Sequence, residues 1–290
     1  MSPVERYCAP SSLAEATEIL HAGEVTVLAG GTDLMPQMQA GRTPLKRTLM
    51  SVRRVPELGG IAGDGRTIRI GALATISELM AHALVKEHLP LLSEAGDHFA
   101  SAQLRNAATL GGNICNASPA GDMLVPLLVL EAQVELASKA KGSVQTRRVP
   151  IGDFFTGPGR TRRAPAELLV AVYVPVPPAG VVARFVKFGT RPALDIAAIS
   201  IGIAAVRRGD ALTRVRVAFG AVAPTPLRAT RTEAALEGRS LSAETIAAAA
   251  TAARAEVHPI SDVRASEWYR RELIHNLTRR VLEDVAAAGH

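Results

Sequence analysis

The apolar positions in the first part of the chain form short runs that predict strands. Each run is uniformly apolar or alternates between apolar and polar residues, and turn residues bound it. The predicted strands cover residues 25–28, 48–52, 67–70, 133–137 and 168–174. Segments of helical character lie between the strands, and the first has a serine cap with Glu15 near the capping-box position. The predicted helices run from Ser11 or Ser12 to His21 and over residues 34–40, 77–82 and 91–99.

The pattern changes near the prolines at 175, 177 and 178. Beyond them, strongly apolar or alternating runs predict three further strands, and the Gly-Asp pair at 209–210 predicts a hairpin between the last two. These strands cover residues 183–188, 196–206 and 214–221. Helical patterns follow over residues 232–237, 243–256 and 266–287. A chain of 290 residues suits about two domains, so we predict an α+β fold divided into residues 1–177 and residues 178–290.

One stretch, residues 105–122, has almost no bulky side chains although apolar runs flank it on both sides. It contains an adjacent glycine pair and many short polar residues, which weaken helices, so we expect it not to be a core helix. Two adjacent glycines bare the backbone to a ligand and open the positive-φ region. This composition favours a loop that wraps a polar, phosphate-bearing ligand; the alternative is a plain surface turn.

A second glycine pair follows the predicted strand at 25–28 and precedes the predicted helix at 34–40. Strand, Gly-Gly, Thr-Asp and helix in this order direct unpaired backbone N–H groups and a helix N-terminus at an anion. The motif is neither the three-glycine dinucleotide fingerprint nor a P-loop. We expect Asp33 to cap the helix, because a carboxylate beside a pyrophosphate would be repelled.

These two motifs resemble a known family. Leu-Ala-Gly-Gly-Thr-Asp-Leu at 28–34 and Thr-Leu-Gly-Gly-Asn-Ile-Cys-Asn-Ala-Ser-Pro-Ala-Gly-Asp at 109–122 are similar to the two FAD-binding signatures of the flavoprotein subunit of molybdenum hydroxylases. That family includes the medium subunits of xanthine dehydrogenase and carbon monoxide dehydrogenase. The resemblance extends from Tyr7 to about Arg280. It implies a two-subdomain FAD-binding domain of the PCMH type, followed by a smaller α+β domain like the C-terminal domain of carbon monoxide dehydrogenase flavoproteins.

The resemblance also implies which residues contact FAD. Residues 29–33 and 109–113 correspond to the contacts with the pyrophosphate and the ribityl chain, and Ile114 would lie near the ring. Asp122 matches an acidic FAD contact, where a carboxylate accepts from sugar hydroxyls; a helix cap is the alternative, and both roles are compatible. The implied cofactor-binding residues are Leu28, Ala29, Gly30, Gly31, Thr32, Asp33, Phe99, Thr109, Gly111, Gly112, Asn113, Ile114, Ser118, Asp122, Leu169 and Lys187.

Three of these residues also have ordinary structural explanations. Phe99 matches an aromatic position near the flavin, but a Phe at a helix end is commonly a core residue. Lys187 lies in a segment similar to the family's third signature and suits an electron-rich ring or a phosphate, whereas a solvated strand lysine is the alternative. Leu169 corresponds to a main-chain contact in relatives and is otherwise a core strand residue. We expect Arg191 and Asp195 to pair with each other rather than to act in catalysis.

Composition excludes several other functions. The two cysteines, Cys8 and Cys115, lie far apart, so the chain cannot hold an iron–sulfur cluster by itself. None of the seven histidines has metal-ligand spacing. The net charge is +6, but the basic residues are scattered and only 3% of residues are aromatic, which argues against nucleic-acid binding. The apolar run at 123–130 is too short to span a bilayer and no secretion signal is visible, so we expect a cytoplasmic protein without a membrane span.

The family role implied is that of the FAD-carrying, electron-transferring subunit of a heterotrimeric oxidoreductase. A large partner subunit would hold molybdopterin and a small partner subunit the [2Fe–2S] clusters, with a dimer of heterotrimers as the expected assembly. Electrons would leave through FAD to an acceptor such as NAD, a quinone or oxygen. Two alternatives stay open: a stand-alone FAD-dependent oxidase or dehydrogenase, and a non-enzymatic assembly module that keeps the flavin fold.

Overall fold

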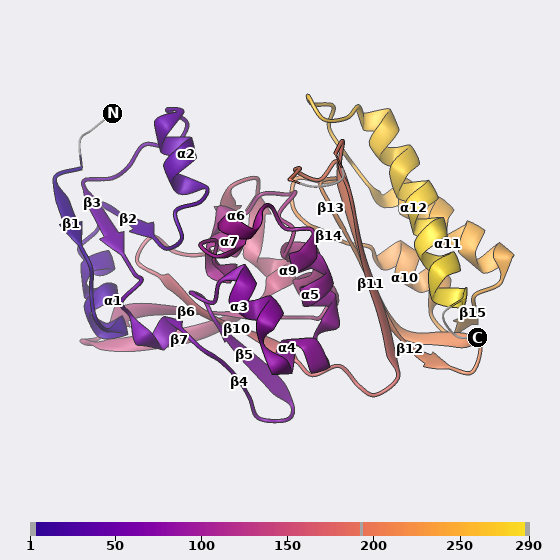
Figure 1. The fold of residues 1–290 in the computed structure, drawn as a ribbon, viewed down its shortest axis with the longest axis horizontal. Coiled ribbons are helices and arrows are strands. Elements are labelled where there is room, and N and C mark those ends of the chain that lie inside the picture. Colours follow the sequence, from indigo (N-terminus) through magenta and orange to yellow (C-terminus); the bar gives the residue numbers. More distant parts are fainter. Residues whose placement is uncertain (1–3, 192–193, 288–290) are drawn as a thin grey trace.

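The computed structural model describes residues 4–191 and 194–287, arranged as three sheets in succession (Figure 1). The first is a parallel sheet of three strands in the order β1-β3-β2, with helices α1 and α2 beside it. Ser12 caps α1 by accepting from the Glu15 N–H, as predicted. The elements of this part are β1 (Arg6–Cys8), α1 (Leu13–His21), β2 (Val25–Leu28), α2 (Leu34–Gln39), β3 (Thr48–Ser51) and the 3₁₀ turn η1 (Pro56–Leu58).

The second sheet lies in the middle of the molecule and is antiparallel, with strand order β4-β5-β10-β6-β7 (Figure 1). Its central strand β10 carries a bulge between Leu169 and Ala171 on the side that pairs with β6. The strands are β4 (Ile61–Gly63), β5 (Thr67–Gly71), β6 (Gln133–Ala140), β7 (Ser143–Pro150) and β10 (Leu168–Pro175). A two-stranded pair, β8 (Phe155–Gly157) and β9 (Arg160–Thr161), lies apart from this sheet.

Short helices pack beside this sheet and join it to the third (Figure 1). Helix α3 begins with a complete capping box between Thr75 and Glu78. The helices are α3 (Ile76–Ala81), α4 (Ala83–His88), α5 (Pro90–Asp97), α6 (Ala102–Arg105), α7 (Leu110–Asn116), α8 (Leu124–Val129) and α9 (Ile151–Phe154).

The third sheet is antiparallel, in the order β11-β12-β13-β14 with β15 paired to β13, and α10, α11 and α12 lie along one of its faces (Figure 1). The hairpin between β12 and β13 forms around Gly209 as predicted. The elements are β11 (Val181–Phe188), β12 (Ile199–Arg208), β13 (Ala211–Gly220), β14 (Leu227–Arg228), α10 (Thr230–Leu236), β15 (Arg239–Ser240), α11 (Ala243–Glu256) and α12 (Glu267–Ala287).

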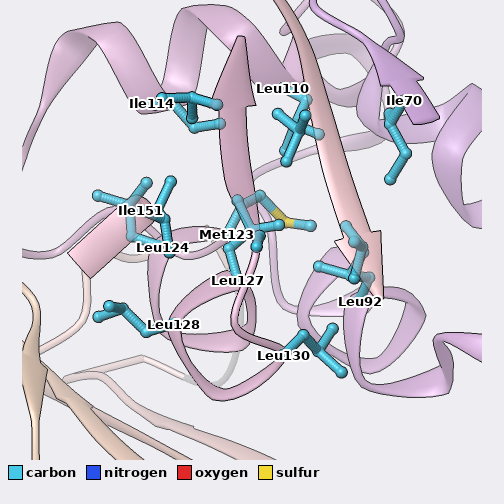
Figure 2. Packing of buried hydrophobic residues seen from close by; sticks show 14 of the residues in the cluster. Ile70, Leu92, Leu110, Ile114, Met123, Leu124, Leu127, Leu128, Leu130 and Ile151 are labelled. Carbon is cyan, nitrogen blue, oxygen red and sulfur yellow. The ribbon is translucent and has the colours of Figure 1, made fainter. Parts of the chain in front are cut away.

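Helix α8 connects the second and third sheets through one hydrophobic core. All six of its residues are buried, and it contacts both β12 and β13. Leu124, Leu127 and Leu128 of this helix belong to the same buried cluster as Leu110 and Ile114 of α7 (Figure 2). Phe185, Ala204 and Ala218 of the third sheet belong to the same core. Because α8 covers one face of that sheet and the C-terminal helices the other, β12 is an apolar run without alternation.

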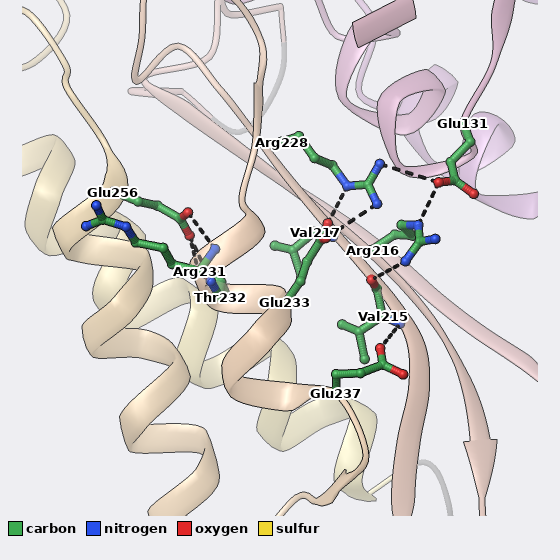
Figure 3. Close-up of polar contacts among 10 residues, drawn as sticks. All are labelled: Glu131, Val215, Arg216, Val217, Arg228, Arg231, Thr232, Glu233, Glu237 and Glu256. Atoms are coloured by element: carbon green, nitrogen blue, oxygen red, sulfur yellow. Dashed lines mark hydrogen bonds and ion pairs between the residues drawn. The ribbon is translucent and has the colours of Figure 1, made fainter. Parts of the chain in front are cut away.

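Carboxylates that follow α10 and α8 bind polar groups of the third sheet (Figure 3). Glu237 at the end of α10 accepts from the backbone N–H groups of Arg214 and Val215, at 2.9 and 2.8 Å, where an irregularity in β13 frees them. Glu131, which follows α8, accepts from Arg216 Nε at 2.8 Å and lies 3.7 Å from Arg228 Nη1.

We expect Glu237→Ala to lower the free energy of unfolding by about 2 kcal/mol, because two backbone donors lose their acceptor. Chemical denaturation of the purified chain measures this loss. Glu283→Ala is the control, since Glu283 is exposed and pairs with Arg279 one turn away; its effect should stay below about 1 kcal/mol. Equal losses in the two variants would show that the Glu237 contacts do not stabilise the sheet.

Within the residues that the structure describes, no helix combines the length and apolar character that a membrane crossing requires.

Candidate functional site

The first glycine motif forms a tight bend between β2 and α2. No acceptor within residues 4–191 and 194–287 pairs with the backbone N–H groups of residues 30–33, so four consecutive donors are available to a ligand. Gly31 has φ +74°, which favours glycine. Asp33 stands at the N-cap position of α2 but makes no capping hydrogen bond; the prediction of a side-chain cap is therefore wrong. Its carboxylate accepts from Gln37 instead, one turn along the helix.

Gly30 brings this bend into contact with the second motif. A Cβ atom on Gly30 would lie 2.0 Å from the Ala107 carbonyl oxygen, far inside the closest approach of real atoms. The two glycine motifs are more than 70 residues apart in sequence, yet their backbones touch here. Only glycine at position 30 allows this contact.

The second motif corrects one expectation. Residues 110–116 form helix α7 with two fully buried side chains, although we expected this stretch not to be a core helix. Thr109 caps it by accepting from the Gly112 N–H at 3.1 Å, and Leu110 and Ile114 are fully buried. Capping and burial thus outweigh the low helix propensity of Gly and Asn.

The glycines of α7 serve close packing rather than a left-handed turn. Neither Gly111 nor Gly112 has positive φ. A Cβ on Gly111 would lie 2.7 Å from Ala72 Cβ, so this glycine lets α7 rest on residue 72. The Val170 carbonyl, at the bulge of β10, accepts from the Ala72 N–H at 2.9 Å. The bulge beside Leu169 therefore supports the start of α7.

The first turn of α7 has no free backbone donor, in contrast to the first bend. The N–H groups of Leu110 and Gly111 donate to Ala74 and Ala72 at 2.9 Å each, and those of Gly112 and Asn113 donate to Thr109. What this motif presents instead are acceptors. Asn113 Oδ1 and Asp122 Oδ1 are buried without a hydrogen-bond partner among the described residues. Buried acceptors of this kind are rarely left unpaired unless a ligand or water completes them.

Asp122 and Lys187 form a buried ion pair between the second motif and β11. Lys187 Nζ lies 2.8 Å from Asp122 Oδ2 and also donates to the His98 carbonyl at 3.0 Å. The two side chains are 13% and 6% exposed, so Lys187 is not a solvated strand lysine. Burial raises the pKa of Asp122, and the Lys187 ammonium partly offsets that rise. Asp122 caps no helix, since the N-cap position of α8 is Met123.

The remaining predicted residues lie around these contacts. Thr32 is half-buried in the first bend and Ser118 Oγ accepts from the Ala120 N–H. Phe99 is half-buried against the main core just after α5. Leu169 and Ile114 are core residues. Arg191 Nη2 lies 3.7 Å from Asp195 Oδ1, so these two residues pair as predicted. A shallow surface pocket opens beside Lys187 and is lined by Asp97, His98, Ala100, Lys187, Gly189, Arg191, Leu194 and Asp195.

Three contacts that shape the site carry no signal in the sequence. Ala72 and Ala107 receive the glycines, and the His98 carbonyl holds Lys187. Alanine is too common for its packing role to be recognised, and a carbonyl acceptor leaves no trace in side-chain chemistry. Within the described part of the chain, no three His, Cys, Asp or Glu residues gather in a way that would bind a metal ion.

Comparison with known proteins gives a consistent family assignment along the whole chain. The family model described as FAD binding domain in molybdopterin dehydrogenase matches residues 2–177, and that of the CO dehydrogenase flavoprotein C-terminal domain matches residues 184–285. The xanthine dehydrogenase FAD-binding subunit of Escherichia coli O157:H7 is 37% identical over 98% of this chain and 97% of its own. The carbon monoxide dehydrogenase medium chain of Hydrogenophaga pseudoflava is 32% identical over 97% and 96%. A solved structure of that organism's carbon monoxide dehydrogenase, lacking the Mo-pyranopterin moiety, superposes with a TM-score of 0.91 at 33% identity, covering 97% and 96% of the two chains.

Proposed function

The chain belongs to the family of FAD-binding subunits of molybdenum hydroxylases, and from this premise we propose that it passes electrons between partner subunits and an external acceptor. It is an oxidoreductase subunit with an FAD-binding domain followed by a CO dehydrogenase flavoprotein C-terminal domain. The division at residues 177 and 178 and the individual cofactor contacts are part of the proposal.

The donor and acceptor pattern of the two motifs fits FAD. Four backbone N–H groups at residues 30–33, which have no acceptor among the residues that the structure describes, suit the anionic pyrophosphate. Asn113 Oδ1 and Asp122 Oδ1, buried and without a partner in the described part of the chain, suit the hydroxyl groups of the ribityl chain and ribose. The Gly30 contact places these donors and acceptors on adjoining backbones. This juxtaposition is the observation that carries the proposal.

When bound, FAD supplies the redox chemistry, because it accepts electrons and releases them to a second partner. The residues of this chain bind and orient it. Lys187 adds a fixed positive charge at the site, and Asp122 holds that lysine in place. We propose that a large subunit with molybdopterin and a small subunit with [2Fe–2S] clusters supply the electrons, in a dimer of heterotrimers. The names of relatives that are medium chains or subunits of multi-subunit dehydrogenases support this assembly.

The acceptor is proposed to be NAD, a quinone or oxygen. The cytoplasmic location expected from the sequence stays a prediction.

Purifying the tagged chain from its native host tests this function. We expect a yellow complex with a single FAD per chain, together with molybdenum and iron that separate from the chain when the subunits are dissociated. Absorbance spectra and metal analysis measure both. A colourless complex would contradict the proposal, and FAD without molybdenum or iron would indicate a stand-alone flavin oxidase instead.

A further inference from the structure

Arg270 is a buried cation in the first turn of α12. It is 4% exposed, and both ends of its guanidinium fork are engaged. Nη1 donates to the Ala221 carbonyl at 3.0 Å, and Nη2 lies 2.7 Å from Asp262 Oδ1. Asp262 is itself fixed, because the same oxygen accepts from the Arg264 and Ala265 N–H groups. An arginine is rarely buried to this extent unless it makes directed contacts, so its position points to a role at Ala221.

Ala221 adopts a backbone conformation that alanine disfavours. Its φ is +62°, in the left-handed region where Cβ crowds the backbone. Within residues 4–191 and 194–287, Arg270 is the donor to the Ala221 carbonyl and no other donor reaches it. Such a conformation persists only where surrounding contacts hold it. Arg270 provides the contact on the carbonyl side.

The N–H of Ala221 faces the second glycine motif and donates to the Pro119 carbonyl at 2.7 Å. Pro119 lies between Ser118 and Asp122, both proposed FAD contacts. This segment is otherwise held at its ends, by the Gly159 N–H that donates to the Ala117 carbonyl and by the Lys187 pair at Asp122. The Ala221 contact thus fixes the middle of the segment.

We propose that Arg270 is a positioning residue for the FAD site. By holding Ala221 in the left-handed conformation, it keeps the Ala221 N–H on Pro119 and so places Ser118 and Asp122. FAD affinity then depends on α12, although the Arg270 guanidinium contacts neither Ser118 nor Asp122. The inference rests on the proposed function, because it concerns the FAD site.

The test compares Arg270→Met with Arg271→Met by titrating FAD into the apo chain and following flavin fluorescence. Arg271 is the neighbouring residue on α12; its side chain is 29% exposed and pairs with Glu267. We expect Arg270→Met to raise the FAD dissociation constant by about 10- to 100-fold, and Arg271→Met to change it by less than about twofold. If wild-type chain binds no FAD, the proposed function fails; if wild type and Arg270→Met bind equally well, only this inference fails.

A rescue separates positioning from general support of the fold. Glycine adopts positive φ without the Cβ penalty, so Ala221→Gly in the Arg270→Met background should recover most of the lost FAD affinity. If Arg270 has a purely structural role, Arg270→Met lowers the thermal stability of the apo chain, and adding Ala221→Gly does not restore FAD affinity. That result would overturn the proposal. If Arg270→Met does not fold, Arg270→Lys replaces it in the same comparison, because it keeps the charge but not the fork.

Discussion

Gly30→Ala is expected to remove most FAD binding. The added Cβ would lie 2.0 Å from the Ala107 carbonyl oxygen. This oxygen belongs to the backbone, so the clash cannot be relieved by rotation of a flexible side chain. The two glycine motifs must therefore separate, so that the backbone donors of residues 30–33 and the buried acceptors of Asn113 and Asp122 can no longer bind one FAD molecule together. Overpacking of this kind costs about 3 kcal/mol, which corresponds to a roughly 100-fold weaker FAD complex when the cost falls on the bound state. Fluorescence titration of the purified chain measures the change.

Gly152→Ala is the matched control. Its Cβ would meet Leu128 Cδ2 at 3.5 Å, an ordinary van der Waals contact, and alanine has a higher helix propensity than glycine. FAD affinity should stay within about twofold of wild type in this variant. A Gly30→Ala chain that binds FAD as tightly as the control would show that the contact between the motifs is not needed for the site.

Lys187→Met is expected to cause the largest loss of stability among single substitutions at the site. It leaves the Asp122 carboxylate buried without its cation. Breaking a buried pair from one side costs about 3–5 kcal/mol. Denaturant unfolding of the apo chain measures the loss. The double variant with Asp122→Asn carries no uncompensated charge, so it should be more stable than Lys187→Met alone. If the double variant is less stable than Lys187→Met, the loss in Lys187→Met does not come from an uncompensated charge on Asp122.

The same substitution should change the pH dependence of stability. Burial already raises the pKa of Asp122, and removing Lys187 takes away the interaction that opposes this rise. A carboxyl group with a raised pKa in the folded state binds more protons there than in the unfolded chain. The stability that the Asp122 carboxyl contributes is therefore fully present at a pH below its pKa in the unfolded chain. It is lost as the pH rises through its pKa in the folded chain. Lys187→Met should therefore regain stability relative to wild type as the pH falls from neutral toward the ordinary aspartate pKa of about 4.

Lys139→Met is the control for both experiments, since Lys139 pairs with Glu18 at the surface, where the glutamate side chain is 58% exposed. It should cost at most about 1 kcal/mol and leave the pH profile unchanged. A Lys187→Met profile that parallels the Lys139→Met profile would contradict the assignment of a buried carboxylate at position 122 whose pKa depends on Lys187.

The local pattern of apolar and polar residues was sufficient for some elements. The strand at Val25–Leu28 and the helix at Ala243–Glu256 were predicted with the observed bounds. It was insufficient for β7, whose side chains are mostly exposed and polar, and which is a strand because β6 pairs with it along eight residues. It gave the wrong result for α7, where Thr109 and the core around Ile114 decide the conformation. In each failure a tertiary contact outweighs local propensity.

In the candidate site too, the features with a local sequence motif were predictable, and the contacts between distant residues were not. The two glycine motifs were recognised from their residues, and the structure brings their backbones together at Gly30 and Ala107. The pairing of Asp122 with Lys187 was not foreseen, because 65 residues separate them and neither carries a local signal for the other. Arg270 carries no local sequence signal for its burial. Its contact with Ala221 depends on the fold of the third sheet.

The most direct test of the central claim is a crystal structure of the chain with FAD bound. We predict that oxygens of the pyrophosphate accept from the N–H groups of residues 30–33, and that sugar or ribityl hydroxyls donate to Asn113 Oδ1 and Asp122 Oδ1, with Gly30 still against Ala107. FAD bound away from these groups, or bound with the two motifs apart, would contradict the account.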